Sequence, residues 1–161
     1  MVSPIFLIGI GTEYRCDDSL GLHVVRALKK REIQDTCIVE SSGDGSELIE
    51  MFKLTRIAIV VDAVSAGGKP GTIYRFNVHE QPLLAQLSFH STHAFGLAEA
   101  IELARVLNQL PDTLIVFAIE GENFSTGIGL SASVEKGSRE LREMVFREVQ
   151  KALEQMQTNV N

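Results

Sequence analysis

The chain has 161 residues, 45% of them hydrophobic and 22% charged, with a formal net charge of −6 at pH 7. This length and balance are typical of a single globular domain, residues 1–161, with enough apolar side chains for a proper core. The negative charge argues against a nucleic-acid binder, which needs a basic face. No segment approaches the roughly 18 consecutive apolar residues of a membrane span, so we expect neither nucleic-acid nor membrane binding.

The N-terminus and the cysteines favour the cytoplasm. An apolar run begins by Pro4 without the charged region and cleavage site of a secretory signal. Only two cysteines occur, Cys16 and Cys37, which argues against a disulfide framework. Cys16 is a poor candidate nucleophile because the two acids that follow it disfavour a thiolate.

The first half of the chain alternates predicted strands and helices. Residues 5–10 are apolar and β-branched, as in a buried strand. Apolar residues then recur at four-residue spacing, which predicts a helix that begins near Asp17 and Asp18 and ends around Arg31. Either acid could be the N-cap of this helix.

A second strand at 37–39 and a short helix at 47–53 follow. Residues 57–61 are uniformly apolar, as in a central parallel strand that is covered on both faces. We expect this third strand to stop at Asp62.

The second half continues the alternation. Residues 72–76 suggest a more exposed strand, such as an antiparallel edge, and residues 97–108 share one apolar helical face. Residues 114–119 form the last predicted strand. A terminal helix is expected after Ser131 as its cap, with a tail that frays from about residue 157.

Together these elements predict a three-layer α/β/α sandwich with a twisted, mostly parallel sheet of about five strands. In such folds ligands bind outside the carboxyl ends of the strands, beside a topological switch point. Asp18 follows the first strand, Asp62 ends the third, and His93 lies in the loop after the fourth. These three side chains are therefore expected to converge.

Two carboxylates and one imidazole would make an open metal site. These donors suit nickel, zinc, manganese or ferrous iron, and three protein ligands leave positions for water or substrate. Each residue also has a structural explanation: Asp18 as a helix cap, Asp62 as a turn former and His93 as a residue that orients a loop. The residues alone leave these interpretations balanced.

Other polar residues are weaker candidates. His90 could replace His93, Glu13 could replace Asp18, and Glu120 could be an outer carboxylate, although an exposed acid at a strand end explains Glu120 more simply. The remaining histidines, His23 and His79, are interpreted as helix and loop residues without a role in the site. A serine triad is disfavoured because no Gly-x-Ser-x-Gly elbow occurs.

The Gly9-x-Gly11 opening is a poor dinucleotide fingerprint. Tyr14 stands where the third glycine is expected. Asp17 and Asp18 also place negative charge where a phosphate would need the positive end of a helix. The same acids would favour a cation.

An ordered set of motifs along the chain resembles the hydrogenase maturation endopeptidases. The set comprises Gly9-x-Gly11, Asp17-Asp18-x-x-Gly21, Asp62-Ala63, His93-x-x-Gly96-Leu97 and Ile128-Gly129-Leu130-Ser131. The similarity spans residues 5 to about 145. It implies a protease that processes the large subunit of nickel–iron hydrogenases at its C-terminus.

The resemblance also implies a role for the three candidate residues. Asp18, Asp62 and His93 match the family's metal-contacting positions and would recognise nickel already inserted in the large-subunit precursor, before a C-terminal extension is removed. The substrate would supply the nickel, and zinc or another divalent ion could substitute. Thr12 and Ser19 stand where the family usually has asparagine and a small residue, often glycine, which concerns loop conformation more than ligation.

Two other functions stay open. One is a non-catalytic, nickel-sensing chaperone of the precursor, and the other is a zinc-dependent hydrolase, which the lack of a His-Glu-x-x-His helix disfavours. For proteolysis, the nearest general base would be a carboxylate oxygen of Asp18 or Asp62, with Glu120 more distant. The modest length and single site suggest a monomer.

Overall fold

The computed structural model describes residues 4–82, 88–89 and 95–160. Within them, the strands form one sheet in the order β2-β1-β3-β6-β4, and the short β5 pairs with β3. The strands are β1 (Ile5–Ile10), β2 (Thr36–Ser41), β3 (Ile57–Ser65), β4 (Ile73–Asn77), β5 (Ser88–Phe89) and β6 (Thr113–Glu120). Strands β2, β1, β3 and β6 are parallel, whereas β4 lies antiparallel on β6 at the edge. The mostly parallel sheet and its antiparallel edge strand are confirmed.

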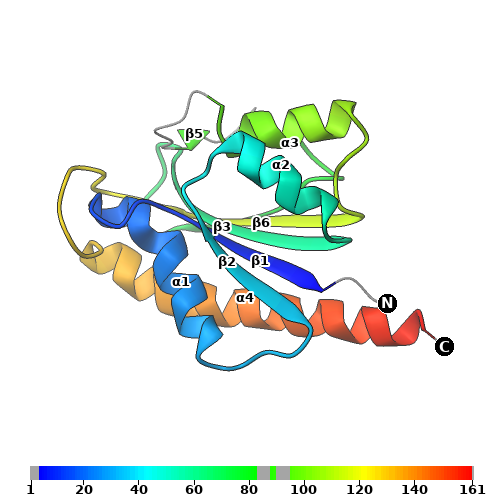
Figure 1. The fold of residues 1–161 in the computed structure, drawn as a ribbon. Coiled ribbons are helices and arrows are strands. Elements are labelled where there is room, and N and C mark those ends of the chain that lie inside the picture. The colour runs from blue at the N-terminus through cyan, green and yellow to red at the C-terminus, as the bar shows by residue number, and fades with distance from the viewer. Residues whose placement is uncertain (1–3, 83–87, 90–94, 161) are drawn as a thin grey trace.

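Helices cover both faces of the sheet, as Figure 1 shows. Helices α2 (Gly45–Lys53) and α3 (Leu97–Val106) lie together on one face, and α1 (Leu20–Lys29) and α4 (Ala132–Thr158) lie on the other. The predicted three-layer sandwich is therefore correct. None of these helices, within the part of the chain that the structure describes, is both long and apolar enough to cross a membrane.

Strand alternation divides the core into two layers. Successive side chains of a strand point to opposite faces, so Phe6 and Ile8 of β1 pack under α2 and α3, while Ile5 and Leu7 pack against α1 and α4. Strand β3 divides its residues in the same way. Its uniformly apolar sequence thus reflects burial on both faces, as expected for a central parallel strand.

Helix α1 packs directly on the backbones of β1 and β3. A methyl group at Gly21 would clash with the carbonyl oxygens of Ile10 and Val61, so only glycine permits this approach. The contact places the turn that precedes α1 over the carboxyl ends of these two strands.

Two predicted boundaries were wrong. Strand β3 does not stop at Asp62: its pairing with β6 continues to Val64, opposite Glu120, and the strand ends at Ser65. A 3₁₀ turn, η1 (Cys16–Ser19), holds the paired acids, and Ser19 occupies the N-cap position of α1. Neither Asp17 nor Asp18 therefore caps α1.

Candidate metal and catalytic site

Asp62 lies where β3 separates from β1. On that edge of β3, the pairing with β1 runs to Val61, and the described pairing resumes with β5 at Val64. Asp62 and Ala63 lie in the interval between these partners. In the strand order, β1 leads outward to β2 and β3 leads the other way toward β6, so β1 and β3 flank a topological switch point, where α/β folds bind ligands.

Asp18 and Asp62 come close to one another at this switch point. Both are almost fully buried, with 3% of each residue exposed. The Asp62 carboxylate accepts a hydrogen bond of 2.8 Å from the Ala63 N–H. Burial raises the pKa of Asp62 well above its ordinary value, and the negative charge of Asp18 raises it further. The structure therefore brings together two of the three predicted side chains.

The third predicted residue, His93, lies outside the described residues, as does its alternative, His90. Within the described part of the chain, no three His, Cys, Asp or Glu side chains are grouped to hold a metal ion. Two buried carboxylates that repel one another nevertheless suit a divalent cation, which would neutralise both. Such a cation would need further ligands from His93 or from a bound substrate.

Asp17, the neighbour of Asp18, fastens the loop between β6 and α4. Its carboxylate accepts hydrogen bonds from the N–H groups of Glu122, Asn123 and Ser131, at 2.7 to 2.9 Å, and from the Ser131 hydroxyl at 2.7 Å. Burial alone would raise the pKa of Asp17, but these hydrogen bonds outweigh it and hold the pKa below its ordinary value. Asp17 therefore connects the turn that carries Asp18 to a distant loop.

Glu120 has a comparable structural role at the end of β6. The expectation of an exposed acid at a strand end was wrong, since only 3% of Glu120 is exposed. Its carboxylate accepts hydrogen bonds from the Ala66 N–H at 2.9 Å, the Gly68 N–H at 3.2 Å and the Tyr74 hydroxyl at 3.2 Å. Burial and the charge of Glu120 raise the pKa of Tyr74. The carboxylate is thus occupied in holding the loop that follows β3.

The weaker candidates have other surroundings. Glu13 forms an ion pair of 3.2 Å with Arg26, which also binds Glu40. His23 is exposed on α1, and His79 is an exposed residue whose ring contacts the Pro111 carbonyl at 2.7 Å. These surroundings explain Glu13 and His79 structurally and leave His23 as an exposed helix residue, as the sequence suggested.

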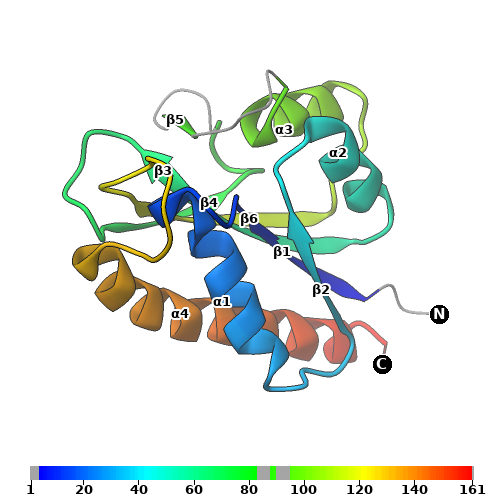
Figure 2. The same cartoon turned by 60° about the vertical axis from the view of Figure 1, so that its left-hand side comes forward.

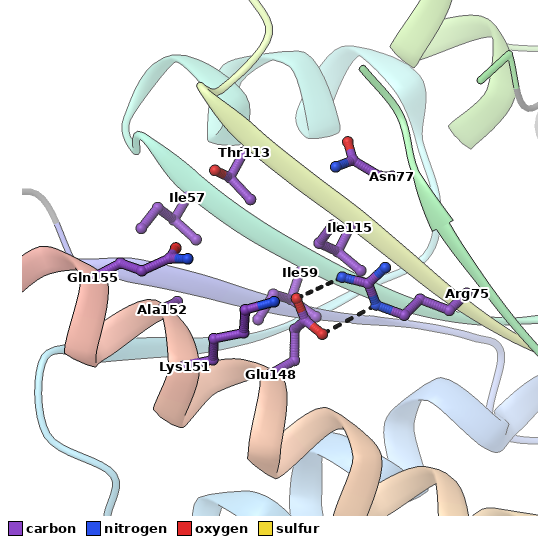
Figure 3. Close-up of a pocket in the computed structure, with 10 residues that line it drawn as sticks. All are labelled: Ile57, Ile59, Arg75, Asn77, Thr113, Ile115, Glu148, Lys151, Ala152 and Gln155. Carbon is purple, nitrogen blue, oxygen red and sulfur yellow. Dashed lines mark hydrogen bonds and ion pairs between the residues drawn. The ribbon is translucent and has the colours of Figure 1, made fainter. Parts of the chain in front are cut away.

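A separate pocket lies at the opposite edge of the sheet. Figure 3 shows it between α4 and the amino-terminal parts of β3 and β6, next to the ion pair between Arg75 and Glu148. Its volume is about 170 Å³. This is below the roughly 300 Å³ at which small-molecule pockets begin, and no buried acid lines it. We therefore assign the functional site to the carboxyl edge.

The fold and this edge define an α/β protein with a buried acidic site at the carboxyl ends of its parallel strands. A family model for hydrogenase maturation proteases matches residues 22–148, a range that includes Asp62 and His93 and begins after Asp18. The chain belongs to the hydrogenase maturation protease family. The resemblance inferred from its motifs is confirmed.

Individual relatives agree with this assignment. The hydrogenase 2 maturation protease of Escherichia coli K12 is 29% identical over 134 residues, which are 81% of each chain. The hydrogenase expression/formation protein HupD of Thiocapsa roseopersicina is 26% identical over 118 residues, which are 72% of this chain. The match spans only about half of that relative's length, 53%.

Solved structures show the same fold. The hydrogenase maturating endopeptidase HybD from Escherichia coli superposes with a TM-score of 0.80 at 24% identity, and the match covers 92% of this chain and 93% of that one. HybD from Thermococcus kodakarensis gives a TM-score of 0.72 at 22% identity over 91% of this chain and 99% of that one. These likenesses establish the architecture.

Proposed function

We propose that this protein is an endopeptidase that recognises nickel in the precursor of a nickel–iron hydrogenase large subunit and removes the precursor's C-terminal extension. The observation that carries the proposal is the buried pair of Asp18 and Asp62 at the carboxyl edge of the sheet, in a chain of the hydrogenase maturation protease family. A buried acidic pair without a cation is costly, so binding a cation brought by the substrate would relieve that cost.

Nickel is part of the substrate in this proposal. Asp18, Asp62 and His93 would complete its coordination and so place the scissile peptide beside the metal. There the ion can polarise the peptide carbonyl or lower the pKa of a bound water. A carboxylate oxygen of Asp18 or Asp62 is the nearest candidate to accept the proton of that water. Binding would thus act as a check that nickel has been inserted.

The purified protein need not hold nickel of its own, and zinc or another divalent ion could occupy the acidic pair in the absence of precursor. We place the protein in the cytoplasm as a monomer. Cys16 and Cys37 both lie in the described part of the chain, and both are free thiols, which suits a reducing compartment.

The proposal predicts that trimming depends on nickel in the precursor. Purified protein is mixed with nickel-loaded and with nickel-free precursor, and the mass of each product is measured. Only the loaded precursor should lose its extension. Equal trimming of both would contradict nickel recognition, and a stable complex without any loss of mass would instead identify a chaperone. Stoichiometric zinc together with cleavage of unrelated peptides would identify a zinc-dependent hydrolase.

A second prediction tests whether Glu120 takes part in peptide cleavage. Because its carboxylate holds the loop after β3, Glu120→Gln should lower the free energy of unfolding by about 1–2 kcal/mol and leave the trimming rate within about threefold. Urea denaturation and the mass assay measure the two effects. Glu50→Gln is the matched control, since Glu50 forms an ion pair with exposed Lys53 on α2, and loss of that pair should cost less than about 0.5 kcal/mol. A hundredfold slower reaction in Glu120→Gln would make Glu120 a catalytic residue.

A further inference from the structure

Two large apolar side chains are exposed beside the acidic site. Tyr14 is 63% exposed in the loop after β1, and Ile128 is 84% exposed in the loop before α4. Single exposed apolar residues are common on protein surfaces. These two are unusual because they come from loops far apart in the sequence that lie side by side at the carboxyl edge of the sheet, as Figures 1 and 2 both show. We call them the rim pair.

The backbone under the rim pair is firmly held. An isolated parallel bridge pairs Arg15 with Gly127, and the Gly127 N–H donates to the Tyr14 carbonyl at 2.9 Å. The Cys16 N–H donates in return to the Gly127 carbonyl at 3.1 Å. Tyr14 precedes the bridged pair and Ile128 follows it, so each lies one residue from the bridge that joins their loops.

Hydrogen bonds also connect this bridge to the acidic site. The Asp18 N–H donates to the Arg15 carbonyl at 3.1 Å, and Asp17 binds the loop that carries Ile128 through Glu122, Asn123 and Ser131. The rim pair and Asp18 therefore belong to one fixed unit. Apolar groups fixed in place before binding lose little conformational entropy when a partner covers them.

We propose that the rim pair is a docking surface for the folded large-subunit precursor, which would cover Tyr14 and Ile128 with an apolar patch close to its C-terminal extension. This inference rests on the proposed function, because Asp18 and Asp62 are almost fully buried and a folded substrate can reach them only by contacting the loops at the carboxyl edge of the sheet. Tyrosine is also one of the residue types enriched among those that dominate protein–protein affinity.

Other exposed apolar residues lie elsewhere and serve as controls. Leu54 directly follows α2, and Val106, which is 80% exposed, ends α3. Both helices return the chain toward the amino ends of the following strands, so these residues lie at the edge of the sheet opposite Asp62. They match the rim pair in exposure but should not contact a substrate bound at the acidic site.

The test measures the affinity of the protein for immobilised, nickel-loaded precursor. The double variant Tyr14→Ala/Ile128→Asp should bind about tenfold more weakly or worse, whereas Leu54→Ala/Val106→Asp should bind as the wild type does. In the mass assay, the rim variant should show a raised KM and an unchanged kcat. The single variant Ile128→Ser, with circular dichroism as a check of folding, repeats the comparison with a milder change.

The outcomes separate the docking surface from the proteolysis. Unchanged affinity in a folded rim variant would overturn the docking surface even if the wild type trims the precursor normally. Weaker binding by the rim variant would support the docking surface even if the wild type cuts nothing. A lack of cutting would refute only the peptidase activity. If the wild type sediments as a dimer and the rim variant does not, a second copy of the chain covers the pair, and the docking surface is refuted. If the wild type does not bind the precursor, docking and function are refuted together.

Discussion

Replacing Asp62 by asparagine should abolish trimming of the nickel-loaded precursor and leave the fold intact. Asparagine keeps the size of the side chain and an oxygen that can accept the 2.8 Å hydrogen bond from the Ala63 N–H. It removes the negative charge that would bind the nickel of the substrate. A loss of about a hundredfold or more in the trimming rate is expected, measured by mass spectrometry of the precursor.

The same substitution should make the metal-free protein more stable at neutral pH. Burial, with the charge of Asp18, raises the pKa of Asp62 in the folded state above its value in the unfolded chain. At pH values below the pKa of Asp62 in the unfolded chain, the carboxyl is protonated in both states. As the pH rises toward the higher pKa of the folded state, the unfolded chain releases its proton first, so the wild type loses stability. Asparagine carries no such charge, so the advantage of the variant should grow from acidic to neutral pH.

Urea denaturation at several pH values, with a chelator present, measures this difference. Asp112→Asn is the control, because Asp112 pairs with Arg56 on the surface, where both side chains are mostly exposed. Its effect should be small, about 0–1 kcal/mol. If Asp62→Asn retains wild-type trimming, the proposed function is wrong. If the stability advantage of Asp62→Asn does not change with pH, burial does not oppose the ionisation of Asp62.

Much of the fold could be predicted because apolar periodicity directly reflects burial. The continuous apolar run at 57–61 indicated a strand covered on both faces, and the alternation at 72–76 indicated the antiparallel edge. Parallel strands place their carboxyl ends together, so the sequence alone is enough to assign Asp18 and Asp62 to one edge. The end of β3 was misplaced because Asp62 interrupts the apolar run while the backbone pairing with β6 continues.

The parts that could not be predicted depend on contacts between distant residues. Asp17 was interpreted as a helix cap because an acid just before a helix commonly binds the N–H groups of the first turn. Its hydrogen-bond partners instead lie 105 to 114 residues further along the chain. Glu120 resembled an exposed acid because nothing near it in the sequence reveals the N–H groups of the 66–68 turn. Tyr14 and Ile128 likewise become a pair only through the bridge between Arg15 and Gly127.

Loss of the Asp17 carboxylate should destabilise the protein more than any exposed acid would. Asp17→Ala leaves three partly buried N–H groups and the Ser131 hydroxyl without their acceptor, for an expected cost of about 3–4 kcal/mol in the free energy of unfolding. Asp17→Asn can keep one oxygen in place, so its cost should be about 1–2 kcal/mol. Asp112→Ala, with a cost of about 0–1 kcal/mol, is the exposed control, and urea denaturation at neutral pH measures all three variants.

The effect of Asp17 should depend on pH in the opposite sense to that of Asp62. Hydrogen bonds hold the pKa of Asp17 below its ordinary value despite burial, so its contribution is complete above the unfolded pKa and is lost as pH falls through the lower folded pKa. The difference between wild type and Asp17→Asn should therefore shrink in acid. A constant difference would mean that the ionised carboxylate is not what holds the loop. Because the same carboxylate connects the turn of Asp18 to the loop of Ile128, Asp17→Asn should also weaken binding of the precursor under conditions in which the variant is fully folded.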